Sequence, residues 1–507
     1  MLRAYCFAEL GYPELAIGDA YKAKLLCEEG LAPDKTPLGL NVALCVGMEM
    51  WLLACSSPDY DSEFDVTGVT EAFLLEQQRY AFGLLYVQLG NIGCIVDALE
   101  VCQAAHALFP YEQLFADEMK GLAALTRKKL SLAQTSGMDS LQYLFSMRNG
   151  STLAKPYPWM AEHHLRRSPS VIDAAKKDFE ENYSFSRFGK PGPCALNQVN
   201  IGQVMPEDYP ADPVQLGVFA AHDILAKEQI LLDMTVAGGH SHKSQDMCDN
   251  CFGDFAYGKV PADCCSAIYC SPDCQEESEA YHPALCGKDF DWLYESARAT
   301  DEGGDALGNL LFLRFLGLFV QSGNAHPLDH PLVARLKPQY FNNHRVIFTM
   351  AGSIEQPIQM LQQLGVDVFA DPRYDTWVLR CIWARIMNNK RGYRPPGGGN
   401  IESINTLFSF FNHSCRPNTE WASDGSSSIG VYAIQDIKRG EELTLCYTHG
   451  IENLSFVERQ VVLAPWLGGS CSCQRCNEER ELEESSEEDE DEDEDDSDED
   501  DKDEGFD

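Results

Sequence analysis

The stretch FFNHSCRPNTEW, residues 410–421, places an asparagine, a histidine, a serine and a cysteine side by side, directly after the apolar run SINTLFSFF. The apolar approach indicates a buried segment, whereas four adjacent polar or reactive side chains would not suit a core strand. Polar groups that leave water need partners, because an unpaired buried polar group costs free energy. The pattern therefore predicts that a cofactor or a metal ion gathers these side chains.

Cysteines gather in two further places. Seven of the twenty cysteines lie between Cys248 and Cys286, and three lie in CSCQRC, residues 471–476. The N-terminus has no charged-then-apolar signal pattern, so we expect an intracellular protein, in the nucleus or the cytoplasm, whose thiols are free or bind metal. Cys-x2-Cys and His-x3-Cys spacings supply the sulfur and nitrogen ligands of structural zinc sites. We therefore predict zinc at both places.

The CSCQRC cluster offers three thiolates, one fewer than a closed tetrahedral zinc site needs. Cys415 of the NHSC stretch is the predicted fourth ligand, and it would hold the C-terminal segment over that stretch. The alternative, a trio of reduced and exposed thiols, is unfavourable because clustered surface thiols oxidise readily. His240 and His242, just before the first cluster, are expected to be solvent-exposed loop histidines.

The charge is strongly negative and unevenly distributed. The formal net charge is −40, and residues 478–507 hold 22 acidic and two basic residues, or −20. No basic stripe of the kind that follows a phosphate backbone is present in the sequence, so we expect no direct nucleic-acid binding. The acidic tail is expected to be disordered, either as a solubilising appendage or as a segment that recruits lysine-rich substrates.

At 507 residues the chain can form two to four domains, and 44% apolar content predicts a globular protein. We expect no membrane partner, because we expect no stretch to approach the ~20 uncharged apolar residues of a membrane helix. The run Leu307–Val320 is too short and is expected to be a buried core helix.

The periodicity of apolar residues predicts the elements that position these groups. Residues 1–135 read as helices, and the segments 2–30 and 80–110 resemble tetratricopeptide-type repeats, with a plain helical bundle as the alternative. The Pro- and Gly-rich residues 136–212 read as an irregular linker. Paired strands are expected over 214–234 and again over 427–447, with helices from about 291 to 381 between them. The predicted fold is therefore a multidomain α+β protein.

These features together resemble a SET and MYND (SMYD-type) protein-lysine methyltransferase. The resemblance rests on NHSCRPN (412–418), GEELTLCY (440–447), CSCQRC (471–476) and a MYND-like finger inserted after the first strands. It divides the chain into a TPR-like helical region 1–135, a linker 136–212, first SET strands 213–247, a MYND-type finger 248–286, a helical insert 287–395, a catalytic core 396–450, a post-SET zinc segment 451–477 and an acidic tail 478–507.

The resemblance implies an S-adenosylmethionine-dependent protein-lysine N-methyltransferase that acts on a histone or another protein. Tyr447 matches the catalytic tyrosine where the methyl donor meets the substrate lysine, and it also touches the cofactor. Asn388 is an alternative to its neighbour Asn389 as the residue that binds the amino-acid part of the cofactor. The implied cofactor-binding residues are Gly217, Asn389, Ser409, Phe410, Asn412, His413 and Tyr447.

The resemblance also implies up to three zinc ions, two of them interleaved in the MYND-like finger. In that finger Pro261 stands where the family has a ligand, so Cys265 substitutes for it or the second site is incomplete. The finger is either architectural or a docking surface for a partner peptide. The implied ligand sets are Cys248, Cys251, Cys270 and Cys274 for the first ion; Cys264, Cys265, His282 and Cys286 for the second; and Cys415, Cys471, Cys473 and Cys476 for the third.

Three positions depart from the family pattern. Gln215 replaces the first glycine of the cofactor loop, and Gly469 replaces an aromatic residue, for which Trp466 is the nearest substitute. Lys390 and Arg391 stand where the family often has an aromatic residue. These departures keep a second hypothesis open, a catalytically weak or inactive scaffold whose helical repeats and finger bind other proteins.

Overall fold

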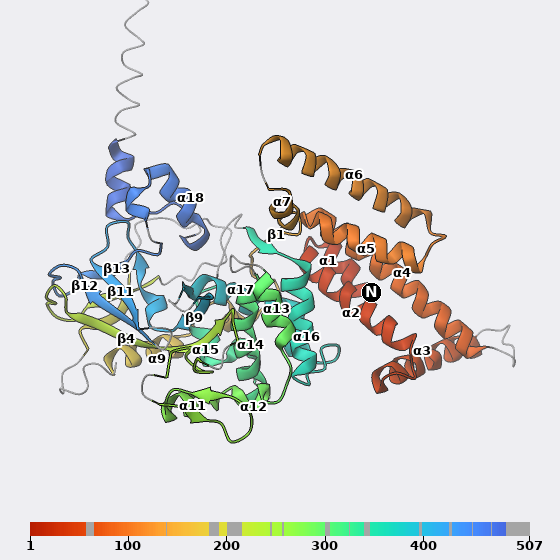
Figure 1. Cartoon of the computed structure of the whole chain (residues 1–507), viewed down its shortest axis with the longest axis horizontal. Coiled ribbons are helices and arrows are strands. Elements are labelled where there is room, and N and C mark those ends of the chain that lie inside the picture. Colours follow the sequence, from red (N-terminus) through yellow and green to blue (C-terminus); the bar gives the residue numbers. More distant parts are fainter. Residues whose placement is uncertain are drawn as a thin grey trace, which may run out of the picture.

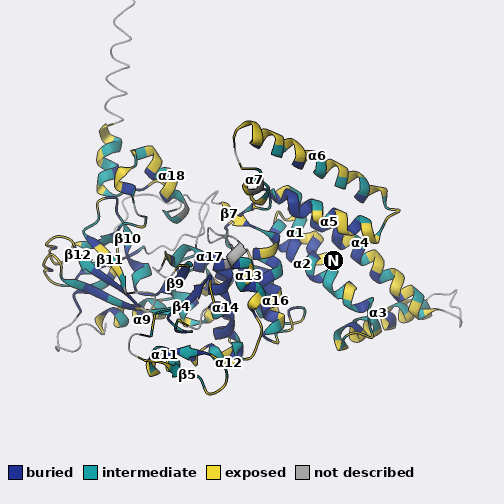
Figure 2. Cartoon of the chain, viewed as in Figure 1, coloured by how far each residue is buried: buried dark blue, intermediate teal, exposed yellow. Residues whose placement is uncertain are grey.

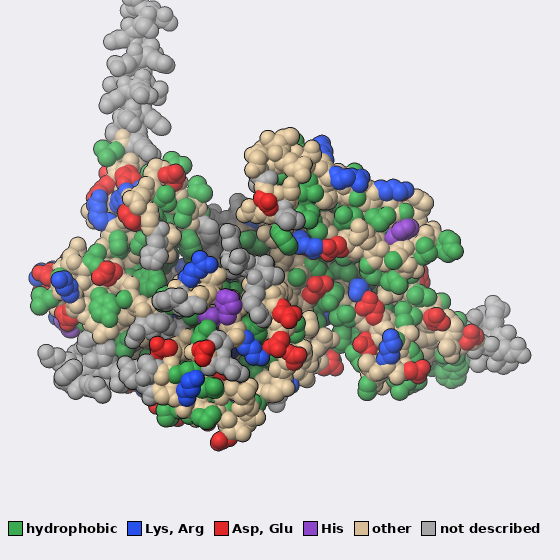
Figure 3. All heavy atoms as spheres, in the orientation of Figure 1, with side chains coloured by type: hydrophobic (Ala, Val, Ile, Leu, Met, Phe, Trp, Pro, Cys, Tyr) green, Lys and Arg blue, Asp and Glu red, His purple; other side chains and the backbone are tan. Residues whose placement is uncertain are grey.

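The computed structural model describes most of the chain, and the chain folds as a mixed α+β protein. An all-helical N-terminal region lies beside a body that combines helices with β-sheets (Figure 1). On the face in Figure 3, acidic and basic side chains of the described residues are interspersed. The described residues are 1–56, 65–137, 139–181, 192–199, 215–243, 246–255, 258–299, 305–323, 325–338, 345–394, 398–424, 428–448, 450–467 and 469–482.

Six helices form the N-terminal region, as the periodicity predicts. Side chains cap two of them, since Thr36 accepts from the backbone of Gly39 and Asp65 from that of Gly68. Gly93, with a φ of 97°, ends the longest helix in a left-handed turn. The helices are α1 (Leu2–Glu9), α2 (Pro13–Gly30), α3 (Pro37–Cys55), α4 (Val66–Ile92), α5 (Ile95–Leu108) and α6 (Gln113–Thr135).

Helix α3 corrects the expectation about apolar stretches. An 18-residue window of α3 has a mean hydropathy of 1.7 and is only 11% buried, so the helix could cross a membrane by length and composition. Figure 2 shows its exposed surface. Glu49 interrupts the apolar run, so the sequence of this helix is not an uncharged stretch. α3 contacts α2 and α4, but most of its apolar surface stays exposed.

The segment predicted to be an irregular linker contains regular elements, so that prediction is wrong where the structure describes it. Its prolines begin a helix instead of preventing one, because Pro169 lies at the first position of α9, where its missing N–H is not needed. The elements are α7 (Ser140–Ser146), β1 (Gly150–Leu153), α8 (Glu162–Leu165), α9 (Pro169–Glu180) and β2 (Cys194–Gln198).

Two sheets form the body, and a second hydrophobic core fills the space between them. One sheet has the order β10-β13-β3-β2 and the other β11-β12-β4-β9-β8. Buried residues of both sheets and of α9 form this core. The strands are β3 (Leu216–Ala220), β4 (Gln229–His240), β8 (Lys390–Tyr393), β9 (Ile401–Asn405), β10 (Asn412–His413), β11 (Thr419–Asp424), β12 (Ser428–Ala433) and β13 (Glu442–Leu445).

The strands predicted to pair with their neighbours in sequence do not pair with each other. β3 and β4 belong to different sheets, and so do β12 and β13. The two crossovers lie together, because Ile224 bridges Ile437 and the Asp223 carboxylate accepts from the backbone N–H of Arg439 at 2.9 Å. Alternating apolar residues predict strands correctly but do not reveal which sheet each strand joins.

The helical insert, which lies in the chain between β4 and β8, joins the body to the N-terminal region. The expected buried helix is confirmed as α14, where Leu311 and Phe315 are fully buried. One hydrophobic core extends from α1, α2, α4 and α5 into α14, α16 and α17. The insert contains α13 (Asp291–Ala299), α14 (Asp305–Gln321), η1 (Pro327–Asp329), α15 (Pro331–Arg335), β7 (Arg345–Phe348), η2 (Ala351–Glu355), α16 (Gln356–Gln363), η3 (Pro372–Tyr374) and α17 (Thr376–Asn389).

The cysteine-rich segment forms a small unit with its own buried cluster, below the body in Figure 1. It contains β5 (Val260–Pro261), β6 (Ile268–Tyr269), α11 (Pro272–Ser278) and α12 (His282–Leu285). His240, expected in an exposed loop, is only 1% exposed at the end of β4, whereas His242 is exposed as expected. The longer-than-predicted strand β4 carries His240 into the fold.

The C-terminal part contains η4 (Phe408–Phe410), η5 (Ile451–Asn453) and α18 (Phe456–Leu467). Residues 474–482 are also helical. The predicted disordered tail therefore begins too early, because Glu479 pairs with the buried Arg459 and is part of the fold. The remainder of that predicted tail, 483–507, lies outside the described residues.

Candidate functional site

The apolar run before NHSC is anchored by a buried carboxylate. Asp233 of β4 accepts hydrogen bonds from the backbone N–H groups of Leu407 and Phe408, both at 2.8 Å. Burial raises the pKa of Asp233 to about 7, against the two N–H donors, which lower it. Asp233 thus fixes the start of η4, which leads directly into the NHSC loop.

Asn412 is held between two strands of the smaller sheet. Its side-chain amide donates to the carbonyl of Leu216 at 3.0 Å and to Oε1 of Glu442 at 2.7 Å. Gly217 permits this packing, because an added Cβ would lie 2.5 Å from Glu442 Oε1 and 2.9 Å from Asn412 Nδ2. The structure therefore brings Gly217 and Asn412 together, as the sequence predicts.

His413 is neutral and has a defined tautomer. Its Nδ1 accepts from the backbone N–H of Tyr447 at 3.1 Å, so Nε2 carries the proton. Nε2 lies 3.3 Å from Cys415 Sγ. Burial lowers the pKa of His413 to about 4. Both ring nitrogens of His413 therefore have partners within the chain.

Tyr447 packs against His413, with ring centres 5.2 Å apart and ring planes inclined at 58°. The residue is 39% exposed, but its hydroxyl is the inner end and donates to the carbonyl of Phe411 at 2.8 Å. Burial of this end raises the pKa of Tyr447 above its ordinary value. The phenol therefore stays protonated at neutral pH, with a defined donor direction.

Ser409 and Phe410 lie at the entrance to this loop. The hydroxyl of Ser409 donates to Thr406 O at 2.9 Å. Phe410 is 3% exposed, and the guanidinium of Arg167 lies 4.6 Å from its ring centre. Phe410 thus belongs to the core between the sheets, and Arg167, which lies between α8 and α9, covers it.

Asn388 and Asn389 lie at the end of α17. Both side-chain amides donate to the carbonyl of Lys337, and Asn389 also donates to Arg385 O at 2.7 Å. These hydrogen bonds stay within the helical insert. The structure therefore links Asn389 to the insert and not, through these bonds, to Asn412 or Tyr447.

Sequence reasoning missed three residues that support the site: Glu442, Asn418 and Asp233. Asn418 donates to Glu442 O at 2.8 Å and accepts from the N–H of Thr444 at 2.9 Å. Asn418 and Glu442 were visible inside the motifs NHSCRPN and GEELTLCY. Asp233 had one available signal, an acidic residue in an otherwise aliphatic strand.

The C-terminal cysteines converge with Cys415. Cys415 Sγ lies 4.0 Å from Cys471 Sγ and 3.6 Å from Cys476 Sγ, and its backbone N–H donates to Cys473 Sγ at 3.4 Å. All four sulfurs lie within 4.8 Å of one another. A tetrahedral zinc with Zn–S bonds of about 2.3 Å separates its sulfurs by about 3.8 Å. The donor set therefore fits zinc.

The finger contains two more clusters, interleaved along the chain. Their metal-ligating atoms lie within 4.8 Å of one another in each cluster. Cys264 and Cys265 place their sulfurs 3.3 and 3.5 Å from His282 Nε2, so the structure gathers Cys265 where Pro261 offers no ligand. The clusters are Cys248, Cys251, Cys270 and Cys274, and Cys264, Cys265, His282 and Cys286. Both donor sets fit zinc.

Residues at or near the positions that depart from the expected pattern have the following places in the structure. Gln215 lies directly before β3, and Trp466 packs against the C-terminal cysteine cluster. Lys390 pairs with Glu402, and the buried Arg391 donates to Asn405 at 2.9 Å. Lys390 and Arg391 therefore stabilise the larger sheet.

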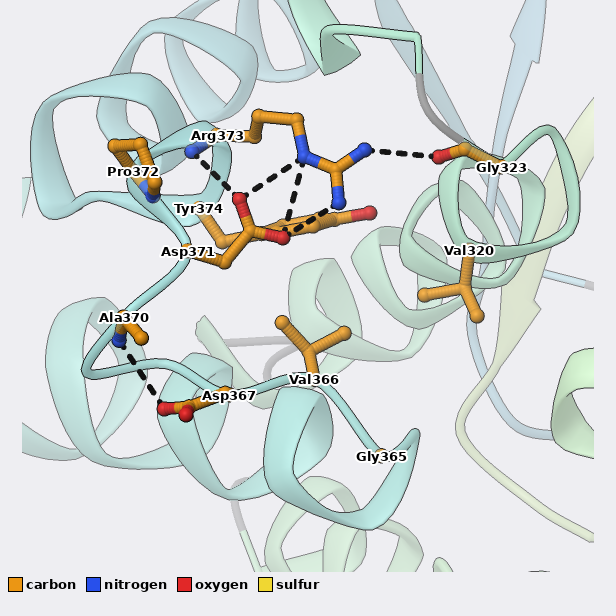
Figure 4. Close-up of a pocket in the computed structure, with 10 residues that line it drawn as sticks. All are labelled: Val320, Gly323, Gly365, Val366, Asp367, Ala370, Asp371, Pro372, Arg373 and Tyr374. Carbon is orange, nitrogen blue, oxygen red and sulfur yellow. Dashed lines mark hydrogen bonds and ion pairs between the residues drawn. The ribbon is translucent and has the colours of Figure 1, made fainter.

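A separate cavity of about 410 Å³ lies beside η3, lined by Val320, Val366 and Arg373 among others (Figure 4). Arg373 is the one cationic group among the described lining residues, and it is already engaged. Arg373 donates to both carboxylate oxygens of Asp371 at 2.6–3.2 Å and to Gly323 O at 3.1 Å. This cavity therefore offers an anion no spare guanidinium.

Comparison with known proteins identifies the domain that contains the NHSC loop. The SET domain family matches residues 215–448. The chain is 25% identical over 286 residues to "Histone-lysine N-methyltransferase ASHR2" of Arabidopsis thaliana, covering 51% of this chain and 67% of that protein. It is 45% identical over 90 residues to "Histone-lysine N-methyltransferase SET5" of Meyerozyma guilliermondii, covering 16% and 18%.

A third relative is "Potential protein lysine methyltransferase SET6" of Saccharomyces cerevisiae, 37% identical over 71 residues, with 14% of this chain and 18% of that protein covered. The matches to the two fungal proteins thus span less than a fifth of their length. The predicted SET domain and the predicted enzyme class, a SET-type protein-lysine methyltransferase, are confirmed.

Proposed function

We propose that this chain, with its SET domain over residues 215–448, is an S-adenosylmethionine-dependent protein-lysine N-methyltransferase that acts on a histone or another protein. One observation carries the proposal. Within the matched segment, Gly217, Asn412, His413 and Tyr447 form one hydrogen-bonded and closely packed group. The proposed cofactor-binding residues also include Ser409, Phe410 and Asn389.

Methyl transfer to lysine requires that the substrate amine be neutral and aligned with the methyl group. S-adenosylmethionine, when bound, supplies a methyl group on a sulfonium. Lysine has a reference pKa of about 10.4, so apolar surroundings must favour its neutral form. Phe410 and Phe411 are 3% and 1% exposed and supply such surroundings. Because the Tyr447 proton points to Phe411 O, the phenol oxygen keeps its lone pairs for orienting the substrate amine.

We propose that the three cysteine clusters bind zinc in a structural role. In the C-terminal cluster, the zinc would also fix the loop, because Cys415 joins it to His413 Nε2. The two finger clusters support the predicted MYND-type finger. Its proposed roles remain architecture or docking of a partner peptide.

The function has a direct test. The full-length zinc-loaded protein is incubated with methyl-labelled S-adenosylmethionine and purified core histones, the substrates named for its relatives. We expect labelled histone lysine with the wild type and a loss of at least about a hundredfold for Tyr447→Phe, which removes the orienting oxygen. If the wild type transfers no label yet folds and holds zinc, core histones are not its substrate. If it also fails to bind S-adenosylmethionine, the methyltransferase proposal itself is wrong.

A second candidate function, protein binding by the TPR-like helices, is favoured by an apolar groove between α3 and α4. The groove has a volume of about 600 Å³ and exposes Leu44, Met48 and Trp51. The residues that line the groove and their immediate neighbours in the chain carry charge of one sign. This set has no basic side chain and five acidic ones: Glu29, Asp34, Glu49, Asp65 and Glu71. We propose that it binds a helical segment with an apolar stripe and flanking lysines or arginines.

This second role is tested with a labelled amphipathic leucine–lysine helix. We expect Leu44→Glu and Met48→Glu to weaken its binding at least about tenfold, because each places a charge in the apolar groove. Leu108→Glu on α5, 55% exposed, is the matched control and should bind as the wild type does. Equal binding by all variants would contradict the groove assignment. We further propose residence in the nucleus or cytoplasm, where such protein partners occur.

A further inference from the structure

Two histidines and an aspartate converge at a point away from the three cysteine clusters. His163 and His164 lie on α8, and Asp329 ends η1, 165 residues further along the chain. The Nε2 atoms of His164 and His163 lie 2.7 and 3.2 Å from the same carboxylate oxygen, Oδ1 of Asp329. The three donor atoms lie within 4.8 Å of one another.

The 3.2 Å separation of His163 and Asp329 is that of two ligands around a single small cation, whereas the 2.7 Å contact of His164 is a hydrogen bond that a bound cation would replace. Metal bonds of about 2.0–2.1 Å to nitrogen and oxygen place tetrahedral ligands about 3.3 Å apart. The side chain of His164 is 9% exposed, whereas those of His163 and Asp329 are 59% and 47% exposed. One ligand is therefore anchored in the protein, and the other two leave the point accessible from solvent with room for a fourth ligand.

Neighbouring groups orient the anchored histidine. The ring of His326 stacks on that of His164 with ring centres 4.9 Å apart and planes 22° apart. His326 is itself fixed, because its Nδ1 accepts from the N–H of Leu328 at 3.2 Å. The guanidinium of Arg385 donates to the carbonyl of His164. These contacts fix the position of the His164 ring and its backbone.

We propose that His163, His164 and Asp329 form a fourth metal site, which binds zinc or a similar divalent transition ion with an open position for water. Two imidazole nitrogens and one carboxylate oxygen suit zinc, whereas calcium and magnesium prefer oxygen ligands throughout. The absence of sulfur separates this site chemically from the three cysteine clusters.

The ion would join two segments that also meet near the NHSC loop. Arg167 follows α8 by two residues, donates to Arg335 O of α15 at 2.8 Å and lies over Phe410. A metal bridge between α8 and η1 would therefore hold Arg167 in place over the core that carries the loop. Its role towards the methyltransferase site would be positioning and not catalysis.

Zinc content tests the proposal directly. Full-length wild type, His163→Ala and Asp329→Asn are dialysed to equilibrium against micromolar zinc, and the zinc-to-protein ratio is measured by plasma mass spectrometry. Both substitutions affect exposed side chains, so the fold should persist. His222→Ala, at an exposed histidine elsewhere, is the matched control. We expect the wild type and the control to hold one zinc more per chain than the two variants.

A spectrum identifies which site binds. Cobalt added to protein whose cysteine clusters already hold zinc should give weak visible bands without thiolate charge-transfer absorption, and these bands should be absent in both variants. Equal zinc content in all four proteins would overturn the proposal. So would a cobalt spectrum dominated by thiolate charge transfer, which would assign the additional ion to the cysteines.

Discussion

The backbone N–H of Tyr447 donates to Nδ1 of His413 at 3.1 Å, and the opposite nitrogen of the same ring lies 3.3 Å from Cys415 Sγ. One neutral imidazole thus connects the proposed catalytic tyrosine to the C-terminal cysteine cluster. A metal ion in that cluster would fix the histidine, and the histidine would fix the backbone of Tyr447. The zinc segment and the methyltransferase site are therefore expected to fail together.

Replacement of Cys415 by serine tests this connection. We expect Cys415→Ser to lose one zinc per chain, because a cluster of three thiolates is one ligand short. We also expect weaker S-adenosylmethionine binding, since His413 loses its sulfur partner. Zinc content and calorimetry are the measurements.

Cys446→Ser is the matched control for that variant. Its sulfur donates to Thr448 O at 3.0 Å and belongs to none of the described clusters. It should keep the zinc content of the wild type. Full zinc content in Cys415→Ser would show that another group completes the site.

Gly217→Ala tests the close packing on Asn412. The added methyl would meet Glu442 Oε1 at 2.5 Å and Val199 Cγ2 at 2.7 Å, and such overpacking costs about 1–3 kcal/mol. We expect Asn412 to be displaced and S-adenosylmethionine affinity to fall at least about tenfold, as measured by calorimetry.

Gly392→Ala on β8 is the control, because its Cβ would meet nothing within 4 Å and its φ is negative. Unchanged affinity in Gly217→Ala would mean that Asn412 has no part in the cofactor site.

Asp233 predicts a pH dependence of stability. Its pKa in the folded protein is about 7, above the ordinary 3.8. The folded state therefore retains a proton that the unfolded state releases, so the contribution to stability is full below about pH 4 and is lost as the pH rises towards 7. The slope is at most about 1.4 kcal/mol per pH unit.

Asp233→Asn cannot ionise, so its unfolding midpoint relative to that of the wild type should rise between about pH 4 and about pH 7. Asp436→Asn is the control, because this exposed carboxylate also accepts from a backbone N–H, that of Ala226. A constant difference between Asp233→Asn and the wild type would contradict the assigned protonation.

The local motifs of the sequence predicted which residues lie close together. NHSC, GEEL and CSCQRC brought Asn412, Tyr447 and Cys415 into one hypothesis, and the structure places them together. Helical periodicity likewise predicted α1, α2, α5 and the buried α14. In these cases the pattern that predicts the structure lies within a short segment of the chain.

The features that the sequence did not predict depend on distant contacts. The alternation in β3, β4, β12 and β13 carries no information about which sheet each strand joins, so the crossovers were misread as hairpins. His164 and Asp329 are 165 residues apart, and no motif links them. Asp233 reads as one polar residue in a strand until the backbone of Leu407 is placed against it.

Calorimetric titration of the full-length, zinc-loaded protein with S-adenosylmethionine tests the central claim most directly, with Asn412→Ala measured beside the wild type. The account predicts saturable binding to the wild type with one cofactor per chain, and at least about tenfold weaker binding to the variant, whose smaller side chain leaves Leu216 O and Glu442 without the amide donor. Absence of binding to folded wild type, or equal binding by both proteins, would contradict a cofactor site at the NHSC loop.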